Sequence, residues 1–197
     1  MFNLQKTRRA CHRAKLLLAI GWLLALPAAA RAAESPRSGG ELVFAVGEIP
    51  PSFDGHRETT FGMLHPVAPH YSTLLRFDPQ NYPKIVGDVA ESWSFSRDGL
   101  TLTVKIRNGI KFHDGTPLTA QDVKATYDKI IFPPEGVASA RKALYVMVDK
   151  VDAPDNSTVV FKLKNIAASF LANLASPWNF IYKAEIIAKD PHWYEKN

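Results

Sequence analysis

Alternating apolar and polar residues predict the clearest secondary structure of this chain, between residues 92 and 107. Trp93 and Phe95 alternate with serines, and the turn dipeptide Asp98-Gly99 follows them. Beyond that turn, apolar side chains at every second position of residues 100–107 alternate with threonine, lysine and arginine. Because successive side chains of a strand point to opposite faces, the pattern predicts an antiparallel hairpin with one face on a core and one in water.

A helix is predicted to begin directly after Thr119 and to end before Pro133-Pro134. Thr119 can cap the first turn, and Asp122 stands three residues later, where a capping box has Glu or Gln. Two prolines in succession stop a helix, because neither can donate a backbone hydrogen bond. The apolar residues that recur at helical spacing are Val123, Tyr127 and Ile130.

The segment that joins the hairpin to this helix, residues 106–123, is dense in turn signals. Asn108-Gly109 and Asp114-Gly115 are turn dipeptides, since glycine accepts a positive φ without steric cost. Pro117 fixes its own φ and disfavours helix at the preceding Thr116. The segment is therefore predicted to run from the end of a strand through two turns into a capped helix.

Weaker patterns predict the remaining elements. The continuous apolar run at residues 42–46 predicts a strand that is buried on both faces. Residues 61–75 predict a helix that is broken near Pro66 or Pro69. The other predicted elements are a second hairpin at residues 148–153 and 158–163, a short helix at 167–175, a strand at 180–182 and a helix at 184–189.

Three motifs follow one another between residues 87 and 123. The first is Gly87-Asp88-Val89-Ala90-Glu91-Ser92-Trp93, the second is Asp98-Gly99-Leu100, and the third runs unbroken from Ile106 to Val123. Together they resemble the signature of the family 5 extracellular solute-binding proteins, which are the peptide and nickel receptors of ABC importers. The sequence departs from the family pattern at Gly87, where the family usually has Pro, and at Ile106, where it has Leu.

The resemblance extends on both sides of these motifs. Ser52-Phe53-Asp54 is similar to the Leu-Asp-Pro corner of the family, with Gly55 in the place of Pro. The similarity covers the chain from about Leu42 to the C-terminus, and it is strongest between Ile85 and Tyr127.

The resemblance implies an α/β fold with the type II-like bilobal architecture of periplasmic binding proteins, of which the N-terminal lobe and its inserted subdomain are present. Residues 33–69 would then begin the ligand-facing lobe. Residues 70–175 would form the inserted α/β subdomain that carries the signature, and residues 176–197 would return to the first lobe. Members of the family continue beyond this point into a second lobe, so we expect this chain to be a fragment or a truncated product.

The same resemblance implies capture of a peptide or a similar small solute for an ABC importer. In the family the solute is held without covalent bonds between two lobes, and the closed form binds permease subunits in the inner membrane. No enzyme activity, cofactor, metal or nucleic acid is implied, and the complete protein is expected to be a monomer. Many solutes remain open, including dipeptides, oligopeptides, opines, nickel complexes and oligosaccharides.

Site residues are carried over from the family by position. The family's loop after the Asp corner contributes to its cleft, and the chain returns to the ligand-facing lobe near Trp178, for which a core role is also open. The expected ligand-binding residues are Glu58, Thr59, Thr60, Phe61, Trp178 and Asn179. The signature residues are expected to be structural and to touch no ligand: Trp93, Asp98, Gly99, Phe112, His113, Asp114, Gly115, Thr116, Pro117, Thr119 and Asp122.

Residues 1–32 have the composition of a secretory signal peptide. Five lysines and arginines precede the apolar run Leu16–Leu26, which is too short to span a bilayer and ends at Pro27. We expect cleavage after Ala32, with Ala30 as the competing site, and export to the periplasm. A mitochondrial presequence would be rich in serine, and this segment has none. Two adjacent arginines leave the twin-arginine route open beside the general one.

The charge balance changes once this segment is set aside. The whole chain has 24 Lys and Arg against 19 Asp and Glu, but six of the basic residues and none of the acidic ones lie in residues 1–32. Residues 33–197 therefore carry 18 basic against 19 acidic residues, which gives no indication of nucleic-acid binding. The single cysteine, Cys11, also lies in the segment, so the remainder must be stable without disulfides.

Two rival hypotheses come from other classes of protein. His113-Asp114 could be the metal-binding dyad of a His-Asp hydrolase, but it leads from a strand into Gly-Thr-Pro, which favours a turn. The second rival is a free-standing interaction domain that binds no small solute.

Apart from these two rivals, a metal cluster could form from His56, His65 and His70, although His65 and His70 are five residues apart with prolines between them.

Overall fold

The structure is a computed structural model that describes residues 38–41 and 43–197. The predicted targeting segment 1–32 and Leu42 lie outside the described residues. Residues 44–197 form one compact unit. In the part of the chain that the structure describes, no helix is both long enough and apolar enough to cross a membrane.

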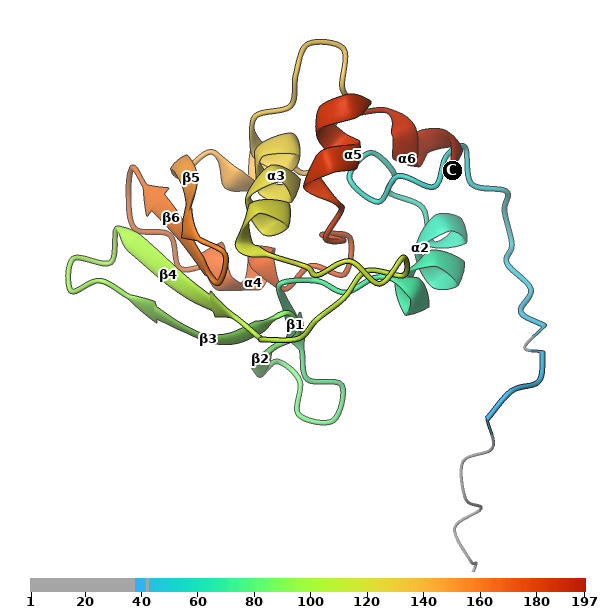
Figure 1. Ribbon diagram of the computed structural model, residues 1–197, viewed down its shortest axis with the longest axis horizontal. Coiled ribbons are helices and arrows are strands. Elements are labelled where there is room, and N and C mark those ends of the chain that lie inside the picture. The colour runs from blue at the N-terminus through green and yellow to red at the C-terminus, as the bar shows by residue number, and fades with distance from the viewer. Residues whose placement is uncertain (1–37, 42) are drawn as a thin grey trace, which may run out of the picture. The chain divides into compact units, whose positions relative to one another are not determined.

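A four-stranded antiparallel sheet confirms the two predicted hairpins. Its strands lie in the order β3-β4-β6-β5, so that the second hairpin pairs with the first through its inner strand (Figure 1). Leu102, Val104 and Ile106 are buried on one face of the sheet, as the alternation predicts, and Lys105 between them is exposed. The strands are β3 (Ala90–Phe95), β4 (Thr101–Ile106), β5 (Val148–Asp155) and β6 (Thr158–Leu163).

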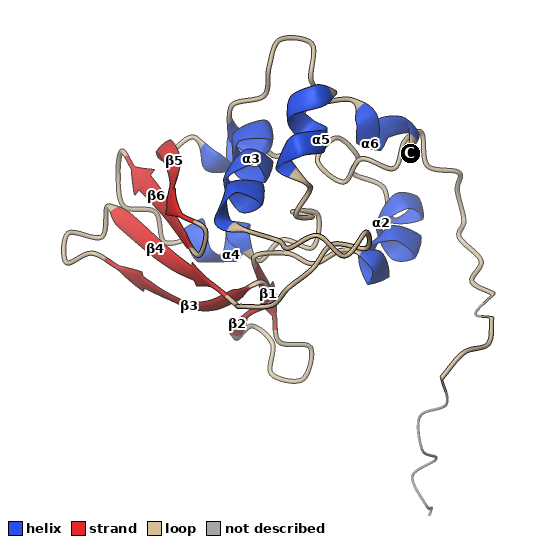
Figure 2. Ribbon diagram, in the orientation of Figure 1, coloured by secondary structure: helices blue, strands red, loops and turns tan. Residues whose placement is uncertain are grey.

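The predicted helix is α3 (Ala120–Ile131), and it packs on the sheet (Figure 2). Its capping box is present, and the backbone N–H of Thr119 donates to the Asp122 carboxylate at 2.8 Å. The predicted apolar stripe is fully buried against the sheet: Val123, Tyr127 and Ile130. Burying this stripe, with side chains of this size, is worth roughly 1.5–3 kcal/mol per residue.

Shorter elements complete the compact unit. The predicted helix 61–75 is shorter than expected, because its regular part ends before Pro69 and the chain becomes extended at Tyr71. These elements are α2 (Phe61–Val67), η1 (Ala68–His70), β1 (Leu75–Phe77), β2 (Ile85–Gly87), η2 (Lys142–Tyr145), α4 (Phe170–Leu174), α5 (Ala184–Lys189) and α6 (Trp193–Lys196).

Two predicted strands are wrong. Residues 43–46 form no strand, and Val43 and Phe44 are exposed, because none of the described strands pairs with this segment. Residues 180–182 are buried as predicted, yet they also lack a ladder. The backbone of Ile181 donates one hydrogen bond to Ser72 at 2.9 Å, and that of Tyr182 bonds a threonine side chain instead of a strand.

Two clusters of buried apolar side chains lie in the compact unit. The larger cluster is formed by the sheet, α3 and α4. The smaller cluster joins α2 to residues 180–194, through Met63, Leu64, Val67, Phe180, Tyr182 and Tyr194. Residues 33–69 and 176–197 are the two ranges that the resemblance assigns to the same lobe, so a shared core is in keeping with those boundaries, which stay predictions.

The signature turns are built as their residue types predict. Gly99 and Gly115 have φ of +71° and +82°. The Asp98 carboxylate accepts the Leu100 N–H at 3.0 Å, and the Asp114 carboxylate accepts the Thr116 N–H at 3.0 Å. Each turn therefore pairs a glycine at positive φ with a carboxylate that satisfies backbone donors.

We predict that Gly115→Val destabilises the fold by about 1–3 kcal/mol, because a β-branched residue at positive φ is strained. A Cβ at Gly115 would meet no atom within 4 Å, so the loss would come from the backbone and not from a clash. Gly47 is the matched control: it also has open space around it but no positive φ, and Gly47→Val should change stability by less than about 0.5 kcal/mol. Urea unfolding of both variants measures the difference, and equal losses would contradict the prediction.

Candidate functional site

A second face of α3 is polar although it is buried. Asp122, Thr126 and Lys129 are spaced four and three residues apart, so they form one stripe along the helix, which we call the polar stripe. Two of its members bind the same segment, residues 182–184. The Asp122 carboxylate accepts the N–H of Ala184 at 2.9 Å, and the Thr126 hydroxyl accepts the N–H of Tyr182 at 2.9 Å.

The third member, Lys129, forms a buried ion pair with Asp54. Both side chains are 1% exposed, and the ammonium donates directly to the carboxylate. Asp54 also accepts the backbone N–H of His56 at 2.9 Å, and its own carbonyl accepts the N–H of Glu58 at 2.9 Å. Because an unpaired buried charge costs several kcal/mol, the pair fixes the loop of residues 52–58 on α3.

Arg141 holds the other side of the same loop. Its guanidinium donates to the carbonyl of His56 at 3.2 Å and to that of Glu58 at 2.6 Å. It also lies over the ring of Trp178, with 4.5 Å between the guanidinium carbon and the ring centre. Burial lowers the pKa of Arg141. Two buried cations from different parts of the chain, Lys129 and Arg141, therefore bind this loop.

His56 is the most deeply buried titratable side chain of the loop. Its Nε2 lies 2.9 Å from the carbonyl oxygen of Phe180, and its ring contacts that of Tyr182. Burial, which is the largest cause, lowers the pKa of His56 to about 4 together with the nearby Lys129 and Arg141, against the raising effect of Asp54. His56 is therefore neutral near pH 7, when two cations stand beside it.

The expected ligand-binding residues divide into exposed and buried groups. Phe61 is 63% exposed, and its ring centre lies 6.4 Å from that of the half-buried Trp178. Thr59 is exposed, whereas Thr60 precedes α2 and its hydroxyl has no partner among the described residues. We call Phe61 and Trp178, with Arg141 behind the indole ring, the aromatic wall.

Two expected residues face the interior instead. The Glu58 side chain accepts a hydrogen bond from the buried Ser52 hydroxyl at 2.8 Å. Asn179 is fully buried, and its amide donates to the Tyr145 hydroxyl at 2.9 Å and to the carbonyl of Asn173 at 2.8 Å. The Glu58 carboxylate and the Asn179 NH₂ group are thus engaged with groups inside the protein and support the segments that carry the aromatic wall.

Sequence reasoning missed Arg141 and the Asp54–Lys129 pair. Arg141 follows a loop without a motif, and nothing local shows that it reaches residues 56 and 58. The polar stripe did carry a signal, since its members recur at helical spacing beside the apolar stripe. A buried lysine at such a position needs a carboxylate partner, but the sequence alone does not name it.

The metal hypotheses find no support in the geometry. Residues 38–41 and 43–197 contain no group of three or more His, Cys, Asp or Glu side chains placed to hold a metal ion. Asp114 pairs with Lys183 at 2.7 Å and accepts the Thr116 hydroxyl at 2.6 Å. These bonds, with Lys183 the largest cause, hold the pKa of Asp114 well below its usual range. His113-Asp114 is therefore a turn that is tied to the segment before α5.

Comparisons with known proteins indicate one family. The family model described as bacterial extracellular solute-binding proteins, family 5 Middle, matches residues 84–197. The glutathione-binding protein GsiB of Pectobacterium atrosepticum is 35% identical over 158 residues, which are 79% of this chain and 30% of that protein. GsiB of Escherichia coli O1:K1 is 36% identical over 169 residues, which are 86% of this chain and 31% of that protein. The chain thus spans about 30% of the length of the curated relatives it matches.

Solved structures of periplasmic binding proteins share the fold. The agropinic acid complex of AgaA from A. tumefaciens R10 has a TM-score of 0.67 at 25% identity and covers 74% of this chain and 29% of its own. A dipeptide-binding protein from Pseudoalteromonas sp. SM9913, in complex with Met-Leu, has a TM-score of 0.64 at 26% identity. The match covers 72% of this chain and 31% of that protein. MoaA from A. tumefaciens R10, in complex with mannopinic acid, has a TM-score of 0.65 at 30% identity. This match covers 73% of this chain and 29% of MoaA. The expected α/β fold, a partial lobe of this architecture, is confirmed.

We predict that His56 makes stability fall as the pH drops from about 6.5 to about 4. The unfolded chain takes up a proton near the ordinary histidine pKa of 6.5, whereas the folded chain takes it up only near pH 4. The folded state is therefore favoured above this window, and about 3 kcal/mol is lost across it as the pH falls.

Urea unfolding between pH 7 and pH 4 measures this loss. Other groups also titrate there, so the test is the comparison with His56→Gln, in which this part of the slope should disappear. His65→Gln removes an exposed histidine instead and should keep the wild-type slope. Parallel pH profiles of wild type and His56→Gln would contradict the assignment.

Proposed function

Because the chain belongs to the family 5 bacterial extracellular solute-binding proteins, we propose that it forms one wall of the solute cleft in the receptor of an ABC importer. The observation that carries the proposal is the aromatic wall. Phe61, at the start of α2, and Trp178 present partly exposed ring surface next to a loop, residues 52–58, that two buried cations hold in place. Rigid aromatic side chains on a fixed frame are typical of binding sites, since little entropy is lost when they meet a ligand.

The solute we propose is a peptide or a related small carboxylic acid. The solutes named for the relatives are glutathione, the dipeptide Met-Leu, and agropinic and mannopinic acids, which all carry carboxylates. Arg141 places a positive charge directly behind the indole of Trp178, which favours an acidic group at the wall. Binding would be non-covalent, without a cofactor and without catalysis.

A run of exposed apolar side chains leads to the aromatic wall. Phe44, Ile49, Phe53 and Phe61 are all exposed, and Ile49 is 94% exposed. Apolar surface that collects on one segment commonly marks a place where further protein binds. We propose that this segment meets the second lobe of the family's architecture, and that the closed receptor then binds permease subunits in the inner membrane.

We predict that the purified chain alone binds glutathione and Met-Leu weakly, with a Kd on the order of 1 mM or more, because one wall cannot bury most of a ligand's surface. An NMR titration should shift resonances of the aromatic wall. Phe61→Ala should reduce these shifts, whereas Phe95→Ala, which removes a partly exposed phenylalanine from β3, should leave them unchanged. Micromolar binding by the monomeric chain, or shifts located elsewhere, would count against the two-lobe proposal.

We also predict that the exported protein begins at or near Ala33, after removal of residues 1–32 or a segment of similar length. The basic start, the short apolar run and the Ala-Arg-Ala sequence are the physical reasons. Mass spectrometry of a periplasmic extract measures the new N-terminus. An intact Met1 in the membrane fraction is the result that would overturn this prediction.

A further inference from the structure

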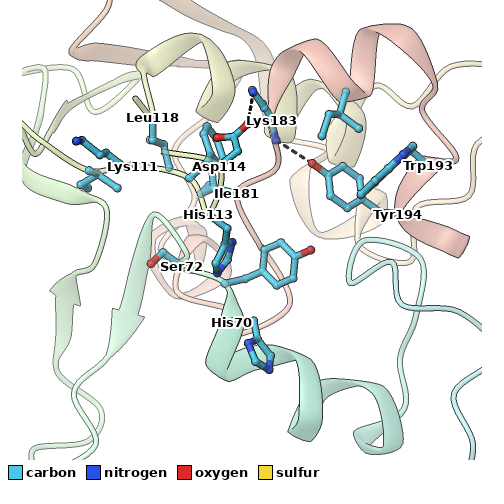
Figure 3. Close-up of a pocket in the computed structure, with 14 residues that line it drawn as sticks. His70, Ser72, Lys111, His113, Asp114, Leu118, Ile181, Lys183, Trp193 and Tyr194 are labelled. Atoms are coloured by element: carbon cyan, nitrogen blue, oxygen red, sulfur yellow. Dashed lines mark hydrogen bonds and ion pairs between the residues drawn. The ribbon is translucent and has the colours of Figure 1, made fainter. Parts of the chain in front are cut away.

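A cavity of about 410 Å³ lies between the turn at Asp114-Gly115 and the C-terminal helices α5 and α6. It shares no residue with the aromatic wall. Its lining comes from residues 70–72, from residues 110–114 with Leu118, and from residues 181–194. Figure 3 shows Ser72, Lys111 and Leu118 on one side of it, Lys183, Trp193 and Tyr194 on the other, and His113 between them. The volume is that of an ordinary small-molecule site.

The interior of the cavity is apolar, whereas its rim is basic. Buried or half-buried Ile110, Leu118, Ile181 and Tyr194 line the interior. Exposed Lys111, His113 and His70 stand at the rim. In the described part of the chain, the side chains of these three rim residues form no hydrogen bond or ion pair with other residues, so their nitrogen atoms are available to a ligand.

The charge of the lining favours an anion. Its ionised side chains are Lys111, Lys183 and Asp114, which leaves one net positive charge when both histidines are neutral. The only carboxylate, Asp114, is already matched by Lys183 at 2.7 Å and by the N–H and hydroxyl of Thr116. Hydrogen bonding to Asp114 raises the pKa of Lys183, which therefore stays charged. A cationic ligand would find no free carboxylate in this lining.

The His113 side chain forms none of the hydrogen bonds that build the turn. The turn itself needs Asp114 to accept backbone donors and Gly115 to take a positive φ. The imidazole of His113 instead faces the ring of Tyr71 edge-on, with 6.4 Å between the ring centres. Its position at the mouth of an apolar cavity is that of a hydrogen-bond donor to a ligand.

We propose that this cavity is a second ligand site, separate from the aromatic wall, which binds a small organic carboxylate with an apolar body. The apolar part would occupy the space between Leu118 and Tyr194. The carboxylate would lie at the rim, where Lys111 and His113 donate to it.

The test uses three probes that share one apolar body. We expect 3-phenylpropionate to bind the purified chain at least about tenfold more tightly than 3-phenylpropanol or 3-phenylpropylamine, with NMR shifts at Ser72, His113 and α5. The aromatic wall, at Phe61 and Trp178, should not shift, so the outcome does not depend on the proposed solute cleft. Equal binding of the three probes, or shifts confined to the aromatic wall, would overturn the proposal.

Variants separate specific binding from general attraction. The double variant Lys111→Gln/His113→Gln should weaken 3-phenylpropionate binding by about tenfold or more. Lys189→Gln removes an exposed lysine from α5 that is not in the lining, and it should have no effect. Ser72→Trp should fill the mouth and abolish binding while the fold remains, as shown by an unchanged unfolding midpoint. Wild-type affinity in both the double variant and Ser72→Trp would contradict the site.

Discussion

The buried ion pair between Asp54 and Lys129 is the constraint on which the candidate site depends. It links a loop near the start of the described chain to the last turn of α3, across 75 residues of sequence. Neither charge can be solvated where it lies, so each needs the other. With the loop held at this point, Arg141 can reach the carbonyls of residues 56 and 58 and support Trp178 from behind.

Two faces of α3 explain how one helix joins two hydrophobic cores. The apolar stripe of Val123, Tyr127 and Ile130 packs on the sheet, and the polar stripe beside it holds the loop at Asp54, the backbone of Tyr182 and the first turn of α5. Directional polar bonds therefore link residues 182–184, beside the smaller core, to α3. Such bonds fix orientation more strictly than apolar contact does, which suits a surface that must keep a fixed shape.

Local signals predicted the parts of the fold that depend on neighbouring residues. The alternation in residues 100–107, the capping box at Thr119 and the glycine turns all appear in the structure as predicted. The strands expected at 42–46 and 180–182 are absent from the described residues 43–46 and 180–182. A strand needs a partner strand, and the residues of a segment do not by themselves determine that partner. For the same reason Arg141 was missed, and the burial of Glu58 and Asn179, two of the expected ligand-binding residues, could not be foreseen.

A double-mutant cycle on Asp54 and Lys129 tests the central claim most directly. Asp54→Leu and Lys129→Met each leave one buried charge without its partner and should each lower the free energy of unfolding by about 3–5 kcal/mol. The double variant removes both charges, so its loss should be smaller than the sum of the single losses by at least about 2 kcal/mol. Losses that simply add would show that the pair does not hold the loop on α3.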